Sequence, residues 1–153
     1  MGYALANGSV ERDVWRYLHS GACSGALNMA LDEALVESVA AGGAPTLRFY
    51  AWSPPAVSFG YAQDPAREVD LGACRALGLD LVRRPTGGRA VLHWQELTYS
   101  VICRPDDERT GGRIEHTYRR IGECLVAGLR LFGVDADLEK AQVRQLRPKG
   151  AAA

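Results

Sequence analysis

The sequence predicts an α/β fold in which short strands alternate with helices. Two long segments carry apolar residues at helical spacing, and short runs rich in β-branched and aromatic residues lie between and beside them. The chain has 153 residues, of which 47% are hydrophobic and 24% charged, and this is enough for one domain with a buried core. The sequence contains no internal repeat or low-complexity linker, so we expect a single unit over 14–138.

A strand over 14–19 is expected to come first, and a helix follows it. Ser24 is a typical N-cap residue, and the glycines at 42–43 are a typical helix end. The apolar stripe of this helix consists of Leu27, Leu31, Ala34, Leu35 and Val39. Residues 46–50 are rich in β-formers and are expected to form a second strand.

The middle of the chain is predicted to contain short elements. The prolines at 54–55 lack backbone donors and therefore indicate an irregular turn, which leads into a short strand over 57–60. A helix is then expected to begin at Asp64-Pro65 or at Asp70, and Gly78 is its natural end.

The last third is predicted to begin with a strand over 79–83. Residues 90–92 and 97–103 are expected to form one hairpin, because the connection between them is short and polar. A long helix follows, whose apolar residues are spaced 4, 3, 4, 4 and 3 apart and end at Gly133. They are Ile114, Tyr118, Ile121, Leu125, Leu129 and Phe132. Residues 139–153 are basic with little apolar periodicity, and we expect a mobile tail.

The charge and the apolar content argue against several functional classes. Eighteen basic residues balance 18 acidic ones, so the formal net charge is zero and a nucleic-acid partner is not expected. No apolar run approaches the roughly 20 residues that cross a bilayer, and the first residues form neither a basic nor a hydrophobic leader. We therefore expect a cytoplasmic protein without membrane attachment.

The cysteines, histidines and acidic residues offer little metal or nucleophile chemistry. The four cysteines form no C-x-x-C pair and the three histidines lack ligand-like spacing, so we expect no metal. Reduced, mostly buried thiols are the simplest interpretation, although Cys23 lies near a predicted helix start, where thiol pKa values fall. Asp32 and Glu33 could form an acid pair, but helix neighbours point about 100° apart and more often face solvent or cap a helix.

The most informative stretch runs from Arg83 to His93. Two adjacent glycines, Gly87 and Gly88, let the backbone adopt conformations closed to other residues and let a ligand approach the main-chain N–H groups. Three arginines lie within seven residues of this turn, and guanidinium groups bind phosphate or carboxylate oxygens. If 89–93 is extended, Arg89 and His93 share one side of it. The stretch therefore suits a phosphate-bearing or acyl substrate.

A hairpin with solvated arginines is the other interpretation of this stretch. It matches neither the Walker A pattern, which requires a lysine, nor the G-x-G-x-x-G dinucleotide turn. The chain also lacks the G-x-S-x-G elbow of α/β-hydrolases. P-loop binding of ATP is therefore not expected.

Several ordered motifs resemble the lipoate and octanoate transferases, which share the biotin/lipoate protein ligase catalytic domain. The matching segments are Trp15-Arg16, Ser20-Gly21, 28–35, 47–50, 52–54, 58–61, Gln63, 83–93 and 95–101. The resemblance extends from about Trp15 to Phe132. It implies an α/β (α+β) fold with a mixed sheet and packed helices, related to class II aminoacyl-tRNA and biotin synthetases.

The resemblance also implies the positions of the ligand-binding residues. Residues 84–93 would form the acyl-binding loop, and Arg84 with 89–92 would hold acyl-adenylate in the ligase branch. The implied substrate-binding residues are Arg84, Gly87, Gly88, Arg89, Ala90, Val91, Leu92 and His93. Arg89 stands where the ligases usually have a third glycine, so the chain is most similar to the cysteine-dependent octanoyltransferase branch. Trp94 replaces the acidic residue usual after the histidine.

The resemblance covers the N-terminal half of the family's catalytic domain. The nucleophilic cysteine and the lysine beside it would lie downstream of the matched region, so no residue of this chain is assigned a catalytic role. The only two lysines of the chain, Lys140 and Lys149, lie near its end. We expect this chain alone to be inactive.

The resemblance implies a reaction of lipoate biosynthesis. The expected activity is transfer of octanoyl from acyl carrier protein to a lysine of a lipoyl-domain protein, such as glycine cleavage H protein, through an acyl-cysteine and without a cofactor. The expected full-length form is a monomer. One alternative is an ATP- and Mg²⁺-dependent lipoate-protein ligase, and another is a non-catalytic subunit that binds an acyl group or a partner chain.

Overall fold

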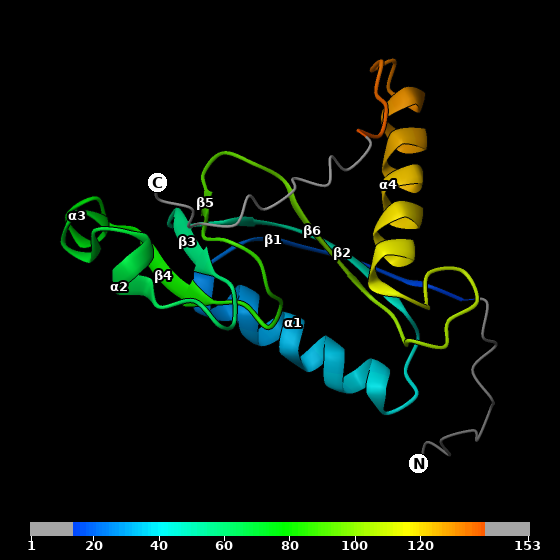
Figure 1. Ribbon diagram of the computed structural model, residues 1–153, viewed down its shortest axis with the longest axis horizontal. Helices are drawn as coiled ribbons and strands as arrows, with labels where there is room; N and C mark the ends of the chain where they lie inside the picture. The colour runs from blue at the N-terminus through cyan, green and yellow to red at the C-terminus, as the bar shows by residue number, and fades with distance from the viewer. Residues whose placement is uncertain (1–13, 140–153) are drawn as a thin grey trace, which may run out of the picture. The chain divides into compact units, whose positions relative to one another are not determined.

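The computed structural model describes residues 14–139 (Figure 1). The chain divides into two compact units, with the boundary between Arg104 and Pro105. Among residues 14–139, the first unit contains two three-stranded sheets and three helices, and the second contains one helix and its flanking loops. Of the tail expected at 139–153, residues 140–153 lie outside the described part of the chain.

The first sheet contains strands β1 (Arg16–Cys23), β2 (Thr46–Trp52) and β6 (Thr98–Ile102) in the order β1-β2-β6. Strand β2 pairs with β1 in parallel and with β6 in antiparallel orientation. The predicted strands at 14–19 and 46–50 are therefore present, and each extends further toward its C-terminal end. Thr46, Arg48 and Tyr50 of β2 are buried and the alternating residues Leu47 and Phe49 are half-buried, because successive residues of a strand face opposite sides of the sheet.

The second sheet contains β3 (Ala56–Phe59), β4 (Asp80–Arg83) and β5 (Val91–His93) in the order β4-β3-β5. The central strand β3 is parallel to β4 and antiparallel to β5. All four residues of β3 are buried, so this strand occupies the centre of the sheet and has an apolar rather than an alternating sequence.

The hairpin predicted from 90–92 and 97–103 does not form. Strand β5 pairs with β3, whereas β6 pairs with β2 in the other sheet. The short polar connection contains Gln95 with φ 50°, and it carries the chain from one sheet to the other. A short linker permits a hairpin but does not require one, because each strand finds its partner through packing with distant segments.

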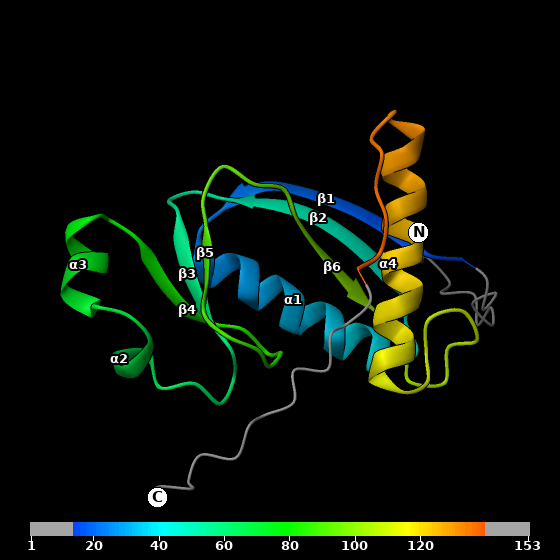
Figure 2. The same ribbon diagram turned by 45° about the horizontal axis from the view of Figure 1, so that its top comes forward.

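Helix α1 (Gly25–Ala40) confirms the first predicted helix. The Ser24 hydroxyl accepts a hydrogen bond from the backbone N–H of Leu27 at 3.3 Å, as its N-cap role requires. Apolar residues of its buried face pack on the first sheet, where Leu35 and Val39 form a cluster with Ile102. Figure 2 shows α1 beneath β1, β2 and β6, with its first turn close to β4.

The start of α1 connects the two sheets. The Gly25 N–H donates to the Asp80 carboxylate at 2.8 Å, and a Cβ atom at Gly25 would lie 2.7 Å from Val82 Cγ1. Only a glycine permits this close approach of helix and strand.

Both predicted helix starts after β3 are used. Helix α2 (Pro65–Glu68) begins after the N-cap Asp64, and helix α3 (Leu71–Ala76) begins after the N-cap Asp70. Cys74 on α3 is buried against Val57 and Phe59 of β3 and forms the second apolar cluster of the first unit.

The second unit is built around helix α4 (Ile114–Leu131), which confirms the long predicted helix. The chain leaves it through Gly133, whose φ of 78° lies in the left-handed region. In the preceding loop the Asp107 carboxylate accepts from the N–H and the hydroxyl of Thr110, at 2.8 and 2.9 Å. These bonds and one from the Arg109 N–H outweigh the opposing effect of burial and lower the pKa of Asp107.

Candidate functional site

The predicted acyl-binding segment forms a loop that joins β4 to β5 and folds over the end of β3. Its backbone contacts the backbone of the segment after β3, where the Tyr61 N–H donates to the Thr86 carbonyl at 3.0 Å. A Cβ atom at Gly60 would lie 2.3 Å from the Gly88 carbonyl oxygen. The glycine at 60 therefore gives the loop room to lie against the sheet, a requirement that the sequence pattern did not identify.

The two glycines of the loop have different surroundings. Gly88 has φ 97°, and a Cβ atom there would lie 2.8 Å from Arg84 Nη2. A Cβ atom at Gly87 would meet only Tyr61 Cε1, at 3.9 Å. Gly88 is thus required by the loop conformation, whereas Gly87 leaves exposed backbone with open space beside it.

The Arg84 guanidinium connects the two sides of the loop by hydrogen bonds. Its Nε and Nη2 donate to the Gly87 carbonyl at 3.2 and 2.8 Å, and Nη2 also donates to the Arg89 carbonyl at 2.8 Å. Its Nη1 donates to the carbonyl and to the hydroxyl oxygen of Ser58, both at 3.0 Å. One guanidinium therefore ties β3 to both sides of the glycine turn.

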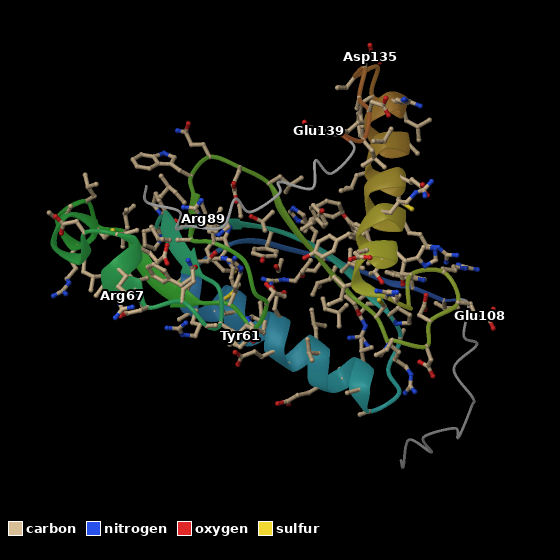
Figure 3. All side chains as sticks on the ribbon, in the orientation of Figure 1. Tyr61, Arg67, Arg89, Glu108, Asp135 and Glu139 are labelled. Carbon is tan, nitrogen blue, oxygen red and sulfur yellow. The ribbon has the colours of Figure 1, made fainter. Side chains whose placement is uncertain are left out.

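Arg83 performs the same task on the neighbouring loop. Its Nη1 donates to the carbonyls of Gly60, Tyr61 and Gln63 at 2.9, 2.8 and 2.8 Å. Arg89 and Tyr61 are exposed, and both are labelled in Figure 3. Within residues 14–139 the Arg89 guanidinium has no hydrogen-bond or ion-pair partner.

None of these three arginines has a carboxylate partner among the described residues. Arg83 and Arg84 donate to neutral oxygens, and Arg89 faces solvent. Uncompensated cations around exposed backbone attract an anion or a group that develops negative charge. The loop is therefore suited to bind a carboxylate, a phosphate or a polarised acyl carbonyl.

The apolar part of the predicted site lies on and beside β5. Ala90 packs against the cluster of Val57, while Val91 and Leu92 are 43% and 52% exposed. Arg89 precedes the strand rather than belonging to it. His93 is buried while Arg89 is exposed, so the two do not form a common exposed wall.

The imidazole of His93 makes a hydrogen bond through each ring nitrogen and stacks on an aromatic ring through one face. Its Nε2 lies 2.8 Å from Ser58 Oγ, and its Nδ1 lies 2.5 Å from Glu96 Oε1. The indole ring of Trp52 stacks on the imidazole with ring centroids 4.1 Å apart. Partial burial acts to raise the pKa of Glu96, but hydrogen bonds from His93 and Thr98 outweigh it and lower this pKa.

A second polar cluster lies between α1 and the first sheet. The fully buried Arg48 donates from Nη1 to Asp32 Oδ1 at 2.8 Å and from Nη2 to Asn28 Oδ1 at 2.7 Å. The hydroxyls of Tyr50 and Ser100 donate to Asp32 at 3.2 and 2.9 Å. Burial first, and then the Asp32 carboxylate, raise the pKa of Tyr50.

The sequence analysis missed this cluster and assigned Asp32 to solvent or a cap. The available signal was an arginine in the middle of a strand of β-forming residues, together with an acidic residue one turn before Leu35 of the apolar stripe of the preceding helix. Such a charge is buried only when it is paired. The sequence analysis likewise missed Ser58 and Glu96, because Ser58 lies in a short apolar strand and Glu96 in the connection assigned to a hairpin.

The four cysteines do not belong to this loop. Cys74 is buried, Cys124 is exposed and the other two are half-buried, so burial is less common than expected. Cys23 lies at the end of β1, and its thiol donates to the Ser20 carbonyl at 3.5 Å. The described residues contain no cluster of three potential metal ligands. Among the helices of residues 14–139, none combines the length and apolar character needed to span a membrane.

Comparisons with known proteins agree with the family suggested by the motifs. Residues 24–146 match the family model described as the lipoyl protein ligase A/B catalytic domain. The octanoyltransferase LipM of Anoxybacillus flavithermus is 49% identical over 128 residues, which are 83% of this chain and 46% of that protein. The chain spans about half the length of the curated relatives that it matches.

Two solved structures show the same fold. The T. acidophilum protein Ta0514 with bound lipoic acid has a TM-score of 0.68 and 36% identity, over 78% of this chain and 48% of that one. A bi-partite lipoate protein ligase of Thermoplasma acidophilum, studied with its E2 lipoyl domain, has a TM-score of 0.69 and 34% identity, over 82% and 48%. The predicted mixed α/β fold is confirmed.

Proposed function

Because the chain belongs to the lipoyl protein ligase A/B catalytic domain family, we propose that it is the acyl-binding part of an octanoyltransferase. One observation supports this more than any other. The loop at 84–90 presents exposed glycine backbone, and its cations have no carboxylate partner among residues 14–139; the exposed apolar side chains of β5 follow directly. A fatty acyl group is complementary to this surface, because it has an apolar chain and a polar carbonyl end.

In this proposal each predicted site residue has a defined task. Val91, Leu92 and the methyl of Ala90 contact the alkyl chain, while the Gly87 N–H and the Arg89 guanidinium face the acyl oxygen. Arg84 and Gly88 give the loop its shape, and Arg84 also adds positive charge close to the acyl oxygen. His93 acts from behind the loop, because it is buried against Ser58.

The proposed reaction proceeds through two acyl transfers. A cysteine thiolate attacks the thioester carbonyl of octanoyl-acyl carrier protein, forming a new carbon–sulfur bond and releasing the carrier as its thiolate, which takes up a proton. The neutral ε-amino group of a lysine on a lipoyl-domain protein, such as glycine cleavage H protein, then attacks the acyl-cysteine, forms the amide, loses a proton and releases the enzyme thiolate. We place the nucleophile downstream of this chain, and we expect the complete enzyme to act as a monomer in the cytoplasm without a cofactor.

Burial makes Cys74 a poor candidate for the nucleophile, because this thiol lies in an apolar cluster where a thiolate is disfavoured.

A lipoate-protein ligase is the second candidate, because the two solved relatives carry lipoic acid or the ligase name. In that reaction ATP would activate the free acid as an acyl-adenylate, with Mg²⁺ on the phosphates. The arginines of the loop would suit the adenylate phosphate as well. Arg89, in place of the third glycine of the ligases, favours the transferase.

The test is to incubate the protein as its gene encodes it with octanoyl-acyl carrier protein and to map the acylated residue by mass spectrometry. We expect transfer to a lipoyl-domain lysine without ATP. An octanoyl group on Cys23, Cys74, Cys103 or Cys124 would contradict the proposed position of the nucleophile. Pyrophosphate release from ATP with free octanoate or lipoate would identify the ligase instead.

A further inference from the structure

A continuous chain of hydrogen bonds leads from the glycine loop to the beginning of β6. Arg84 Nη1 donates to Ser58 Oγ at 3.0 Å, and Ser58 Oγ lies 2.8 Å from His93 Nε2. On its other edge, His93 Nδ1 lies 2.5 Å from Glu96 Oε1. These hydrogen bonds therefore connect four segments, which are the loop, strands β3 and β5 of the second sheet, and the linker between the sheets.

The positions of the protons in these hydrogen bonds follow from Arg84 at one end. A guanidinium only donates, so Ser58 Oγ is the acceptor from Arg84. Ser58 is fully buried, and its single hydroxyl proton has His93 Nε2 as the acceptor within reach. Nε2 is then the unprotonated nitrogen, and Nδ1 carries the proton and donates it to Glu96.

The far end of the chain is also held in place. The Thr98 hydroxyl donates to Glu96 Oε1 at 2.7 Å and accepts from Trp52 Nε1 at 2.7 Å. The same Trp52 ring stacks on His93. The orientation of the imidazole is therefore set by two edges and a face, and it can in turn orient the Ser58 hydroxyl.

The order of the groups is that of a serine-histidine-carboxylate triad, but the surroundings exclude a nucleophilic serine in this conformation. Ser58 has no exposed surface, and the Arg84 guanidinium occupies its hydroxyl oxygen. A substrate carbonyl therefore cannot approach Oγ. The chain of hydrogen bonds is instead directed toward Arg84, and through Arg84 toward the carbonyls of Gly87 and Arg89.

We propose that Glu96, His93 and Ser58 are positioning residues that together keep Arg84 in place and give the Gly87–Gly88 turn its acyl-binding shape. In this arrangement His93 is a neutral imidazole with its proton on Nδ1. The proposal rests on the proposed function for its ligand, but the tautomer and the order of the turn are properties of the chain itself.

The experiment combines nuclear magnetic resonance with ligand titration on the full chain. Long-range proton–nitrogen correlation spectra of the His93 ring report which nitrogen carries the proton. Amide order parameters of Gly87 and Gly88 report the rigidity of the turn. Titration with octanoyl-acyl carrier protein reports the affinity for the acyl donor.

Three variants and one control separate positioning from general stability. Ser58→Ala removes the central hydroxyl with little change in volume, and Glu96→Ala removes the acceptor for Nδ1–H. Glu96→Gln restores an acceptor oxygen without charge. Ser100→Ala is the matched control, because it removes a serine hydroxyl of the other sheet, which donates to Asp32 on α1.

We expect the Nδ1–H tautomer in the unmodified chain. In Ser58→Ala and Glu96→Ala the order parameters of Gly87 and Gly88 fall and the affinity drops about tenfold, the size of one lost hydrogen bond to a charged group. Glu96→Gln recovers most of both losses, and Ser100→Ala changes neither.

Each contrary outcome has a distinct meaning. A proton on Nε2, or on both ring nitrogens, overturns the proposed arrangement of hydrogen bonds, whether or not the octanoyl donor binds. A turn that stays rigid in Ser58→Ala and Glu96→Ala overturns the positioning role. The unmodified chain could show the expected tautomer, and the variants could loosen the turn, while no octanoyl donor binds. In that case the proposed function fails, and the positioning role of Glu96, His93 and Ser58 is supported.

Discussion

Two arginines of the first unit donate hydrogen bonds from all three guanidinium nitrogens, but only one of them has a carboxylate partner among residues 14–139. Arg48 is fully buried and pairs with the Asp32 carboxylate. Arg84 is half-buried and donates only to carbonyl and hydroxyl oxygens. A neutralised charge in the interior contributes to the fold, whereas one held by neutral oxygens at the surface still attracts an anion. We therefore assign Arg84, and not Arg48, to the proposed binding site.

The largest expected effect comes from the buried pair. Arg48→Ala leaves the Asp32 carboxylate buried without its cation, and we expect the free energy of unfolding to fall by about 3–5 kcal/mol. Arg84→Ala removes hydrogen bonds to neutral groups near solvent, and we expect a smaller loss, about 1–3 kcal/mol. Urea denaturation of both variants measures the difference. Equal losses of unfolding free energy would contradict the view that the carboxylate pair makes Arg48 more important for stability than Arg84.

The two loop glycines provide the next test. Gly88→Ala forces a side chain into a positive φ beside Arg84 Nη2, and we expect a loss of about 1–3 kcal/mol in unfolding free energy. Gly87→Ala has open space, so we expect its stability to change by no more than about 0.5 kcal/mol. Its added methyl nevertheless blocks the exposed backbone, so affinity for octanoyl-acyl carrier protein falls. Unchanged affinity in Gly87→Ala would contradict contact between ligand and main chain.

Arg89 is expected to affect binding but not stability. Arg89→Gln removes a cation without a described partner, and we expect about a tenfold weaker affinity for the octanoyl donor, equivalent to roughly 1.4 kcal/mol. The matched control is Arg67→Gln on α2, which removes an exposed arginine paired only with Asp64. Titration at two salt concentrations checks the electrostatic origin, because the difference between the unmodified chain and Arg89→Gln shrinks at high salt.

The smallest expected effect is the acid sensitivity that Glu96 adds. Its pKa is lowered in the folded state, so its stabilising contribution is complete above the ordinary glutamate pKa of 4.5 and is lost as pH falls through the lower, folded value. Unfolding of the unmodified chain and of Glu96→Gln is compared between neutral and acidic pH. The difference in stability between them is expected to be constant above about pH 5 and to shrink below the ordinary glutamate pKa. A difference that grows on acidification would contradict the lowered pKa.

Local patterns predicted most of the secondary structure, and their success has a physical basis. The N-caps Ser24, Asp64 and Asp70 and the helix end at Gly133 depend on neighbouring backbone groups, so they can be identified from a few consecutive residues. The apolar spacing of α4 is likewise local. The loop at 84–93 was identified by its composition, and the motifs around it indicated the family that the comparisons confirm.

Apart from the Glu96 contacts, the features that the patterns missed depend on residues distant in the sequence. The partners of β5 and β6 lie in different sheets, although the two strands are neighbours in the chain. Arg48 meets Asp32 across a helix and a sheet, and Ser58 meets His93 across two strands. Local spacing contains no information about such pairings, because they are selected by packing and by the cost of leaving a buried polar group alone.

The amino-acid order alone thus decided where helices begin and end and which loop is rich in glycine and arginine, since these depend on contacts within a few residues. Only the tertiary structure decided which arginine pairs with a carboxylate and which donates to neutral oxygens alone. The reason is that burial and charge pairing are properties of the space around a side chain, and that space is filled by segments from all parts of the fold.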